Sequence, residues 1–194
     1  MRVYVLKVTE FFVTAKTTAN RAPIHPAAGR RIQTRRSGVH GKGVFATADI
    51  AKGEVIIEYV GEVISWKEAL RRHPHDPSDP NHTFYFHIDE NHVIDALYGG
   101  NSSRWINHSC QPNCEPDEAN GRIFIKARRN IRAGEELNYD YGLVIDAPLT
   151  PELKAEYPCW CGSKKCRGTL LSASSDLNGN PVSAEKQTKK KAKR

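Results

Sequence analysis

The chain has 194 residues, of which 39% are hydrophobic, so its length suits one domain with tails and a modest core. No stretch approaches the ~20 apolar residues that a membrane-spanning helix needs, and the first residues lack the apolar run of a secretory signal peptide. A transit peptide at this acid-poor N-terminus stays an open alternative. Eleven prolines and fourteen glycines among short apolar runs predict a loop-rich β protein rather than a helical bundle.

The net charge of +7 is unevenly distributed. Residues 1–36 carry eight Lys or Arg and one acid, and the last ten residues carry six and one. Residues 37–184 hold the other 15 basic and 20 acidic residues, so the folded body is predicted to be acidic. A nucleic-acid-binding fold puts its positive charge on the folded body. The distribution therefore favours a basic, lysine-containing protein or peptide as partner, with nucleic acid bound only indirectly or through the tails.

In chain order, residues 1–30 show little periodicity beyond one short strand within 3–8, which predicts a poorly ordered lead-in. From residue 31 the segments RIQTRRS, GVHGKGVFA and EVIIEYVGEVI predict strands separated by turns. SWKEALRR predicts a helix with Ser65 as N-cap and Glu68 three residues later, which is the spacing of a capping box.

A Pro/Asp/His loop, HPHDPSDPNH, follows this helix. HTFYFHID and HVIDAL then predict two strands joined by a turn, and RIFIKARRNI predicts another strand that leads through AGEELNYDY into a loop. After Ser172 the chain is polar and Lys-rich, which predicts disorder.

Three cysteines form a C-x-C-x₄-C array, Cys159, Cys161 and Cys166. Three thiolates this close need a cation to balance their charge, and a Zn²⁺ ion at ~2.3 Å from each sulfur provides it, with a fourth ligand completing a structural site. Either Cys110 or Cys114, both in NHSCQPNC, could be that ligand. Disulfides and inert buried thiols are the alternatives, and the odd cysteine count without an export signal disfavours disulfides.

Five segments then occur in a specific order: GKGVF (41–45), EYVGEVI (58–64), GNSSRWINHSCQPNC (100–114), GEELNYDYG (134–142) and CWCGSKKCRG (159–168). This order resembles that of SET-domain protein lysine methyltransferases with a post-SET zinc segment, over about residues 31–171. The size is similar to that of small bacterial SET proteins. The resemblance implies a mainly β fold, a SET-domain β-clip of small curved sheets with a threaded (pseudoknot) C-terminal segment and a small zinc-bound post-SET segment.

The resemblance also divides the chain into a lead-in (1–30), a SET domain (31–145), a post-SET zinc segment (146–172) and a disordered basic tail (173–194). It implies S-adenosylmethionine (SAM) as methyl donor and Zn²⁺ as structural metal. Among the cysteines it points to Cys110, with Cys159, Cys161 and Cys166, as the zinc ligands, and leaves Cys114 as a free thiol.

The resemblance assigns roles to two tyrosines and to a set of SAM-binding residues. Tyr141 corresponds to the catalytic tyrosine, and Tyr139 to the position that governs how many methyl groups fit, where a Tyr limits the product to mono- or dimethyl-lysine. Alternating core aromatics of a strand are the alternative for this pair. The expected SAM-binding residues are Gly41, Lys42, Gly43, Phe84, Asn107, His108 and Trp160.

Two departures from the family pattern affect this set. Phe84 stands where a tyrosine often lines the pocket, and Tyr85 beside it is expected on the other face of the strand. Thr169 and Leu170 stand where many relatives have an aromatic residue against adenine, and Trp160 is expected to replace it. Arg104 is expected to brace the loop that carries Asn107 and His108, with a surface salt bridge as the alternative.

The predicted reaction is methyl transfer from SAM to the ε-amine of lysine in a basic protein or peptide, such as a histone or a histone-like protein. Because the amine must be neutral, burial beside a cationic sulfonium favours the reaction by lowering the lysine pKa from ~10.4. The alternative is a catalytically idle SET module that binds chromatin or nucleoid through its basic tails. The expected location is intracellular: the cytoplasm or nucleoid of a bacterium, or the nucleus of a eukaryote. We expect a monomer.

Overall fold

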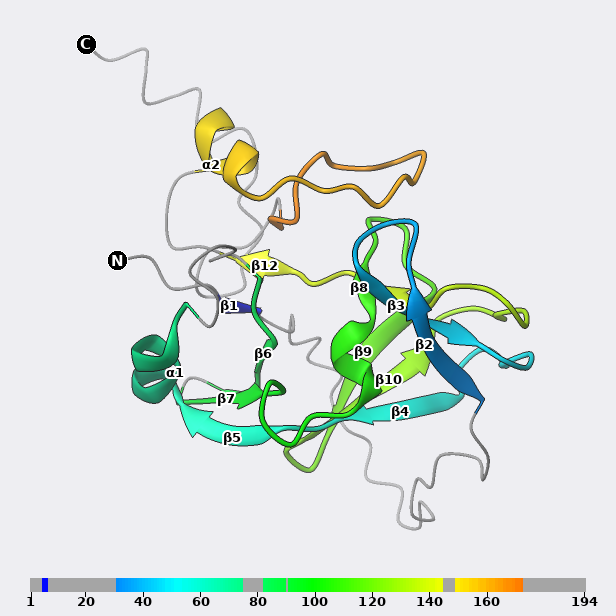
Figure 1. Cartoon of the computed structure of the whole chain (residues 1–194), viewed down its shortest axis with the longest axis horizontal. Helices are drawn as coiled ribbons and strands as arrows, with labels where there is room; N and C mark the ends of the chain where they lie inside the picture. The colour runs from blue at the N-terminus through cyan, green and yellow to red at the C-terminus, as the bar shows by residue number, and fades with distance from the viewer. Residues whose placement is uncertain (1–4, 7–30, 75–81, 90, 145–148, 173–194) are drawn as a thin grey trace, which may run out of the picture.

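The computed structural model describes residues 5–6, 31–74, 82–89, 91–144 and 149–172. These residues form a mainly β protein of several small sheets, which confirms the predicted fold class (Figure 1). The predicted strand within 3–8 is present as β1 (Val5–Leu6). The rest of the predicted lead-in, most of the Pro/Asp/His loop and the basic tail lie outside the described residues.

Two sheets come from the strands that the apolar runs predict. The antiparallel pair β2–β3 and the sheet of order β4-β10-β9 consist of β2 (Ile32–Arg36), β3 (Lys42–Ala46), β4 (Val55–Tyr59), β9 (Cys114–Ala119) and β10 (Arg122–Ala127). The sequence pattern missed β9, because CEPDEA is acidic and contains a proline. Pro116 is tolerated there because β9 is an edge strand, where a residue without an N–H costs no ladder hydrogen bond.

A third sheet, of order β5-β7-β6, contains β5 (Glu62–Ser65), β6 (Tyr85–His87) and β7 (His92–Asp95), and α1 (Trp66–Arg72) follows β5. The predicted capping box is confirmed in part, since the Ser65 side chain accepts a hydrogen bond from the Glu68 N–H. The run EVIIEYVGEVI is two strands in two sheets, and it divides before Gly61. A Cβ at Gly61 would lie 2.6 Å from the Asp95 carbonyl oxygen, so only glycine permits this close approach of two backbones.

The remaining elements join segments that are distant in the sequence. Strand β8 (Asn107–His108) pairs in parallel with β11 (Asn138–Tyr139), and β12 (Leu143–Val144) pairs with β1. AGEELNYDY, predicted as a loop, therefore contains a two-residue strand. Two short helices, η1 (Ser102–Trp105, 3-10) and α2 (Pro151–Glu156), were not predicted. The signal for α2 was present in Thr150, which caps it, followed by a proline in its first turn.

The C-terminal segment has a small apolar core of its own, in which Leu143, Leu153, Tyr157 and Leu171 pack together. In Figure 1 this segment leaves α2 and runs past the end of β8 (orange). The larger core lies among the central sheets and includes Ile106, Leu137 and Tyr139, which flank the β8–β11 pair. The larger core therefore holds the β8–β11 region in place. Among the described residues, no helix is long and apolar enough to cross a membrane.

Candidate active site and metal centre

Four cysteines meet where the C-terminal segment reaches β8. The sulfur atoms of Cys110, Cys159, Cys161 and Cys166 all lie within 4.8 Å of one another. Those of Cys110 and Cys159 are 3.7 Å apart. Two sulfurs on a tetrahedron with metal–sulfur bonds of ~2.3 Å are separated by ~3.8 Å. The cluster therefore has the size for one tetrahedral metal ion, and Cys114 is not part of it.

The electrostatics of the cluster favour a bound cation. Burial raises the pKa of the Cys110 and Cys159 thiols, so a thiolate at either position needs compensating positive charge. The pKa of Cys161 instead falls to about 6, because hydrogen bonds that favour its thiolate outweigh the opposing effect of burial. Backbone N–H groups point at two of the sulfurs, from Arg167 to Cys110 and from Gly168 to Cys166, at 3.4 Å each. Such donors stabilise thiolates that bind a metal.

His108 connects this cluster to the tyrosine pair. Its Nδ1 accepts a hydrogen bond from the Tyr141 backbone N–H at 3.1 Å, and its Nε2 lies 3.3 Å from the Cys110 sulfur. Burial lowers the pKa of His108 to about 4, although the Asp140 carboxylate acts in the opposite direction. The ring is therefore neutral at pH 7, and because Nδ1 is an acceptor, the proton is on Nε2, which can donate to the sulfur.

Tyr139 and Tyr141 lie side by side near the end of β11, with ring centroids 5.1 Å apart. The Tyr141 hydroxyl donates to the Ile106 carbonyl oxygen at 2.9 Å. Burial raises the pKa of both tyrosines, so both phenols keep their protons at neutral pH. Since the Tyr141 proton is used by the carbonyl, its oxygen lone pairs remain to interact with a ligand.

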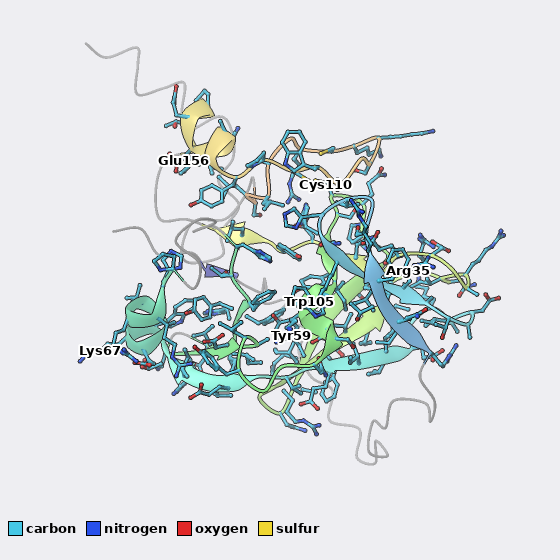
Figure 2. The ribbon with its side chains drawn as sticks, in the orientation of Figure 1. Arg35, Tyr59, Lys67, Trp105, Cys110 and Glu156 are labelled. Carbon is cyan, nitrogen blue, oxygen red and sulfur yellow. The ribbon has the colours of Figure 1, made fainter. Side chains whose placement is uncertain are left out.

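A third buried tyrosine, Tyr59 at the end of β4, belongs to this group, and the sequence analysis missed it. Its hydroxyl donates to the Phe84 carbonyl oxygen at 3.0 Å, and its ring packs on Phe86, which also contacts Tyr139. Burial and the nearby Tyr141 raise its pKa. Figure 2 labels Tyr59 close to Trp105 at the centre of the molecule. Tyr59 is the tyrosine of EYVGEVI, one of the five segments that carry the family resemblance, so its position in that segment could have indicated a role at the site.

A cavity of about 510 Å³ opens beside Tyr141, between the central sheets and the C-terminal segment. Of the residues expected to bind a cofactor, six line it: Gly41, Lys42, Phe84, Asn107, His108 and Trp160. Several lining residues were not foreseen, and among them are His40, His82, Trp105, Tyr157 and Leu170. Trp160, which is expected to cover the adenine of SAM, lines this cavity, and 70% of its surface is exposed.

Asn107 is held by its amide nitrogen. Nδ2 donates to Glu136 Oε1 at 2.8 Å and to the carbonyl oxygens of Lys42 at 3.0 Å and His40 at 3.4 Å. The Glu136 carboxylate also accepts from the Ser37 hydroxyl at 2.7 Å. With its nitrogen engaged by three acceptors, Asn107 can offer a ligand only its side-chain oxygen. Glu136, another residue that the sequence analysis missed, thus determines which atom of Asn107 faces the cavity.

Gly43 lies behind this arrangement, outside the cavity lining. It is buried, and a Cβ there would lie 2.2 Å from Glu136 Oε1. Its missing side chain therefore leaves room for the carboxylate that positions Asn107.

Phe84 and Tyr85 face opposite sides of their strand, as predicted. Phe84 lines the cavity, with its ring centroid 5.1 Å from that of Trp105, while the Tyr85 hydroxyl donates to the Ala69 carbonyl oxygen in a separate core. Arg104 braces the loop before β8, as predicted, because its guanidinium donates to the Ala96 carbonyl oxygen at 3.0 Å. Among the described residues its partners are backbone carbonyls, those of Ala96 and Leu97, rather than a carboxylate.

Comparison with known proteins agrees with this geometry. The family model of the SET domain matches residues 41–142. The chain is 43% identical over 139 residues to "Histone-lysine N-methyltransferase trithorax" of Drosophila virilis, which covers 70% of this chain and 3% of that protein. It is 40% identical over 146 residues to "Histone-lysine N-methyltransferase set-2" of Caenorhabditis elegans, covering 73% of this chain and 9% of that protein.

A third relative, "Histone-lysine N-methyltransferase, H3 lysine-4 specific" of Chaetomium globosum, is 40% identical over 144 residues, which is 72% of this chain and 13% of that protein. The chain thus corresponds to a small part of each of these relatives. The matched region contains the β8–β11 pair, four of the five strands of the two central sheets, and Cys110. On the SET-domain match, which covers more than half of its length, the chain belongs to the SET-domain family.

Proposed function

We propose that this protein is a SAM-dependent protein lysine methyltransferase. The observation that carries the proposal is the cavity of about 510 Å³ at which Asn107 and His108 of β8 meet Tyr141, which follows β11. SAM supplies an electrophilic methyl group on a positively charged sulfonium. The relatives are named histone-lysine N-methyltransferases, which supports lysine as the acceptor.

We assign SAM binding to Gly41, Lys42, Gly43, Phe84, Asn107, His108 and Trp160. The Asn107 side-chain oxygen is an acceptor for the ammonium group of SAM, and the exposed Trp160 covers the adenine. Glu136 carries a negative charge next to Asn107 and accepts hydrogen bonds from neutral groups, Ser37 and Asn107. It can therefore balance part of the positive charge of the ligand.

We assign catalysis to Tyr141 and product control to Tyr139. The Tyr141 oxygen has its proton directed to the Ile106 carbonyl, so it presents lone pairs to the reacting amine and methyl group. The apolar, buried surroundings of the three tyrosines favour the neutral form of a lysine placed among them. Transfer then needs alignment of amine and methyl group rather than a strong base.

We further propose Zn²⁺ as the ion at Cys110, Cys159, Cys161 and Cys166, because four thiolates with tetrahedral spacing are the ligand set of structural zinc sites. The SET domain then covers residues 31–145, and the post-SET zinc segment covers residues 146–172. The zinc ligand of the SET domain is Cys110, and the other three belong to the post-SET segment.

The substrate that we propose is a basic, lysine-containing protein such as a histone or a histone-like nucleoid protein, because the folded body is acidic. The location that fits this substrate is chromatin or nucleoid. The test is incubation of the full chain with labelled SAM and purified histones, followed by mass spectrometry of the labelled protein. We expect one or two methyl groups per target lysine in the wild type. The Tyr139→Phe variant is expected to add a third, because the lost hydroxyl leaves room. Absence of label on any basic protein would favour the idle SET module instead.

Glu136→Gln is expected to weaken SAM binding about fivefold, because it removes the negative charge that supports Asn107 and the cationic ligand, and a charge-assisted hydrogen bond is worth about 1 kcal/mol more than a neutral one. Calorimetric titration with SAM measures the change. Glu135→Gln is the matched control, since this neighbouring acid pairs with Arg129 instead. Equal affinities of the two variants would contradict the role of Glu136.

A further inference from the structure

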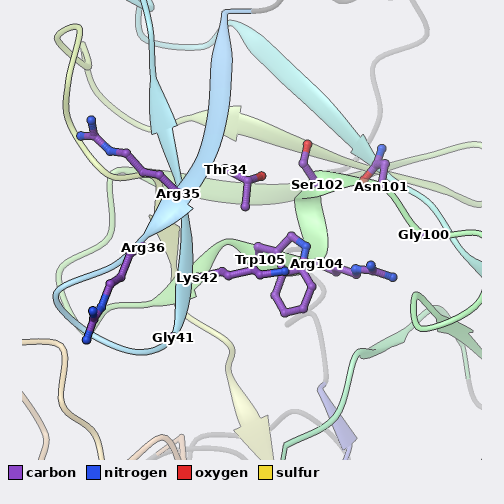
Figure 3. Close-up of a pocket in the computed structure, with 10 residues that line it drawn as sticks. All are labelled: Thr34, Arg35, Arg36, Gly41, Lys42, Gly100, Asn101, Ser102, Arg104 and Trp105. Atoms are coloured by element: carbon purple, nitrogen blue, oxygen red, sulfur yellow. The ribbon is translucent and has the colours of Figure 1, made fainter.

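A second cavity, of about 830 Å³, lies on the surface between the β2–β3 hairpin and η1 (Figure 3). It shares Gly41, Lys42, Arg104 and Trp105 with the first cavity and is otherwise separate from it. The ten lining residues are Thr34, Arg35, Arg36, Gly41, Lys42, Gly100, Asn101, Ser102, Arg104 and Trp105. Four of these ten are cations and none carries a carboxylate, although the folded body is acidic.

Two of these cations, Arg36 and Lys42, lie close together without a carboxylate in the lining to balance their charge. Arg36 and Lys42 are direct partners across the β2–β3 pair, so their side chains emerge on the same face. Like charges placed opposite each other in this way destabilise a hairpin. In the described part of the chain, no ion pair or hydrogen bond engages the Arg36 guanidinium. In Figure 3 the two side chains diverge, Lys42 toward Trp105 and Arg36 away from it, and a bound anion would offset the repulsion between them.

Trp105 brings two of the cations together. The Lys42 ammonium lies 4.6 Å from the indole centroid and the Arg104 guanidinium 4.9 Å from it. In Figure 3 they approach the indole from opposite sides. Within the described residues, Arg104 Nε is also buried without a hydrogen-bond partner. Arg35 instead extends away from Trp105 in Figure 3, onto the opposite face of the β2–β3 pair, where it stacks on Phe45 at 3.8 Å. Two of the positive charges, those of Lys42 and Arg104, are therefore preorganised beside Trp105.

From this arrangement we propose that the cavity binds the phosphate backbone of nucleic acid. Apart from two glycines and Trp105, the lining residues are Arg, Lys, Ser, Thr and Asn, which are the residue types that contact phosphate and sugar in nucleic-acid complexes. An acidic peptide fits less well, because Trp105 is the one apolar side chain in the lining, and a peptide interface has an apolar centre. Arg35 and Arg36 of the lining are also the last residues of the segment 1–36, which carries a charge of +7.

This binding site extends the sequence-based hypothesis, which restricted nucleic acid to the tails. It adds a function to the proposed methyl transfer and does not depend on it. A basic substrate protein that is itself bound to nucleic acid would be held near the active site by this contact.

The experiment uses the full chain and fluorescently labelled oligonucleotides about 20 nucleotides long, both as a single strand and as a duplex, with anisotropy measured from about 0.05 to 0.2 M salt. Loss of one phosphate contact removes about 0.7 from the salt slope for a single strand and about 0.9 for a duplex. We therefore expect Arg36→Gln to weaken binding about fivefold or more at about 0.1 M salt and to lower the slope by that amount.

Arg128→Gln is the matched control, because Arg128 is exposed in the folded body and lies outside this cavity. A second variant, Ser102→Glu, places a carboxylate in the cavity and is expected to weaken binding more than Arg36→Gln. If Arg36→Gln and Arg128→Gln bind alike, the tails alone bind nucleic acid and the proposal is wrong. Tighter binding of a polyglutamate peptide of equal charge would overturn it in favour of an acidic protein. Methylation of a free basic peptide by Arg36→Gln is expected to match the wild type.

Discussion

The Tyr141→Phe variant is expected to lose methyl transfer by about a hundredfold or more while its affinity for SAM stays nearly unchanged. The hydroxyl donates to the Ile106 carbonyl, so its lone pairs have a fixed direction toward the cavity. Removing one preorganised polar group from a water-excluded site costs about 10²–10³ in rate. Single-turnover methylation of a basic peptide, together with calorimetric titration of SAM, separates the two effects.

This substitution also leaves a carbonyl unpaired, which costs about 1–3 kcal/mol of folding stability, so a matched control is needed. Tyr85→Phe provides it, because the Tyr85 hydroxyl also donates to a backbone carbonyl, that of Ala69, but in a core away from the cavity. Both variants are expected to show a similar fall in melting temperature, and only Tyr141→Phe is expected to lose activity. Retained activity in Tyr141→Phe would refute the assigned role.

Removal of the metal by a strong chelator is expected to abolish SAM binding as well as to loosen the C-terminal segment. Three of the four ligands, Cys159, Cys161 and Cys166, come from that segment, and the fourth, Cys110, follows His108 by two residues. The same segment supplies Tyr157 and Trp160 to the cavity wall. Binding of a structural Zn²⁺ is worth about 10–16 kcal/mol in small zinc domains, so the weak apolar core of the segment cannot replace it.

The measurements are metal content by mass spectrometry and SAM binding by calorimetry, before and after chelation and after restoration of Zn²⁺. Cys110→Ser is expected to lose both metal and SAM binding. Cys114→Ala is the control, since Cys114 is a fully buried cysteine outside the cluster, and it is expected to keep one Zn²⁺ and normal SAM binding. Full methyl transfer by metal-free protein would show that the cavity forms without the metal.

Local patterns in the sequence predicted those parts of the fold that depend on neighbouring residues. The helix after Ser65 and the β6–β7 hairpin were predicted because capping and alternation act within a few residues. β9 and α2 were missed, since the first contains a proline that only an edge strand tolerates and the second is only six residues long.

At the site, too, the features that depend on neighbouring residues were predicted, and those that depend on distant residues were not. Cysteine spacing predicted a metal site with three ligands, because those lie within eight residues, and motif order pointed to the tyrosine pair and to Asn107 and His108. By itself the sequence thus indicated the family, the cysteine cluster, and the tyrosine and six proposed cofactor-binding residues that line the cavity.

The tertiary structure decided which groups act on one another. Parallel pairing of β8 with β11 places Glu136 against Asn107 and Tyr141 against His108, and β4 brings Tyr59 to the same place. The basic cavity beside Trp105 also exists only because a hairpin and a 3-10 helix come together. These contacts join residues about 30 to 100 positions apart, and since no local pattern encodes a long-range contact, only the packed fold can specify them.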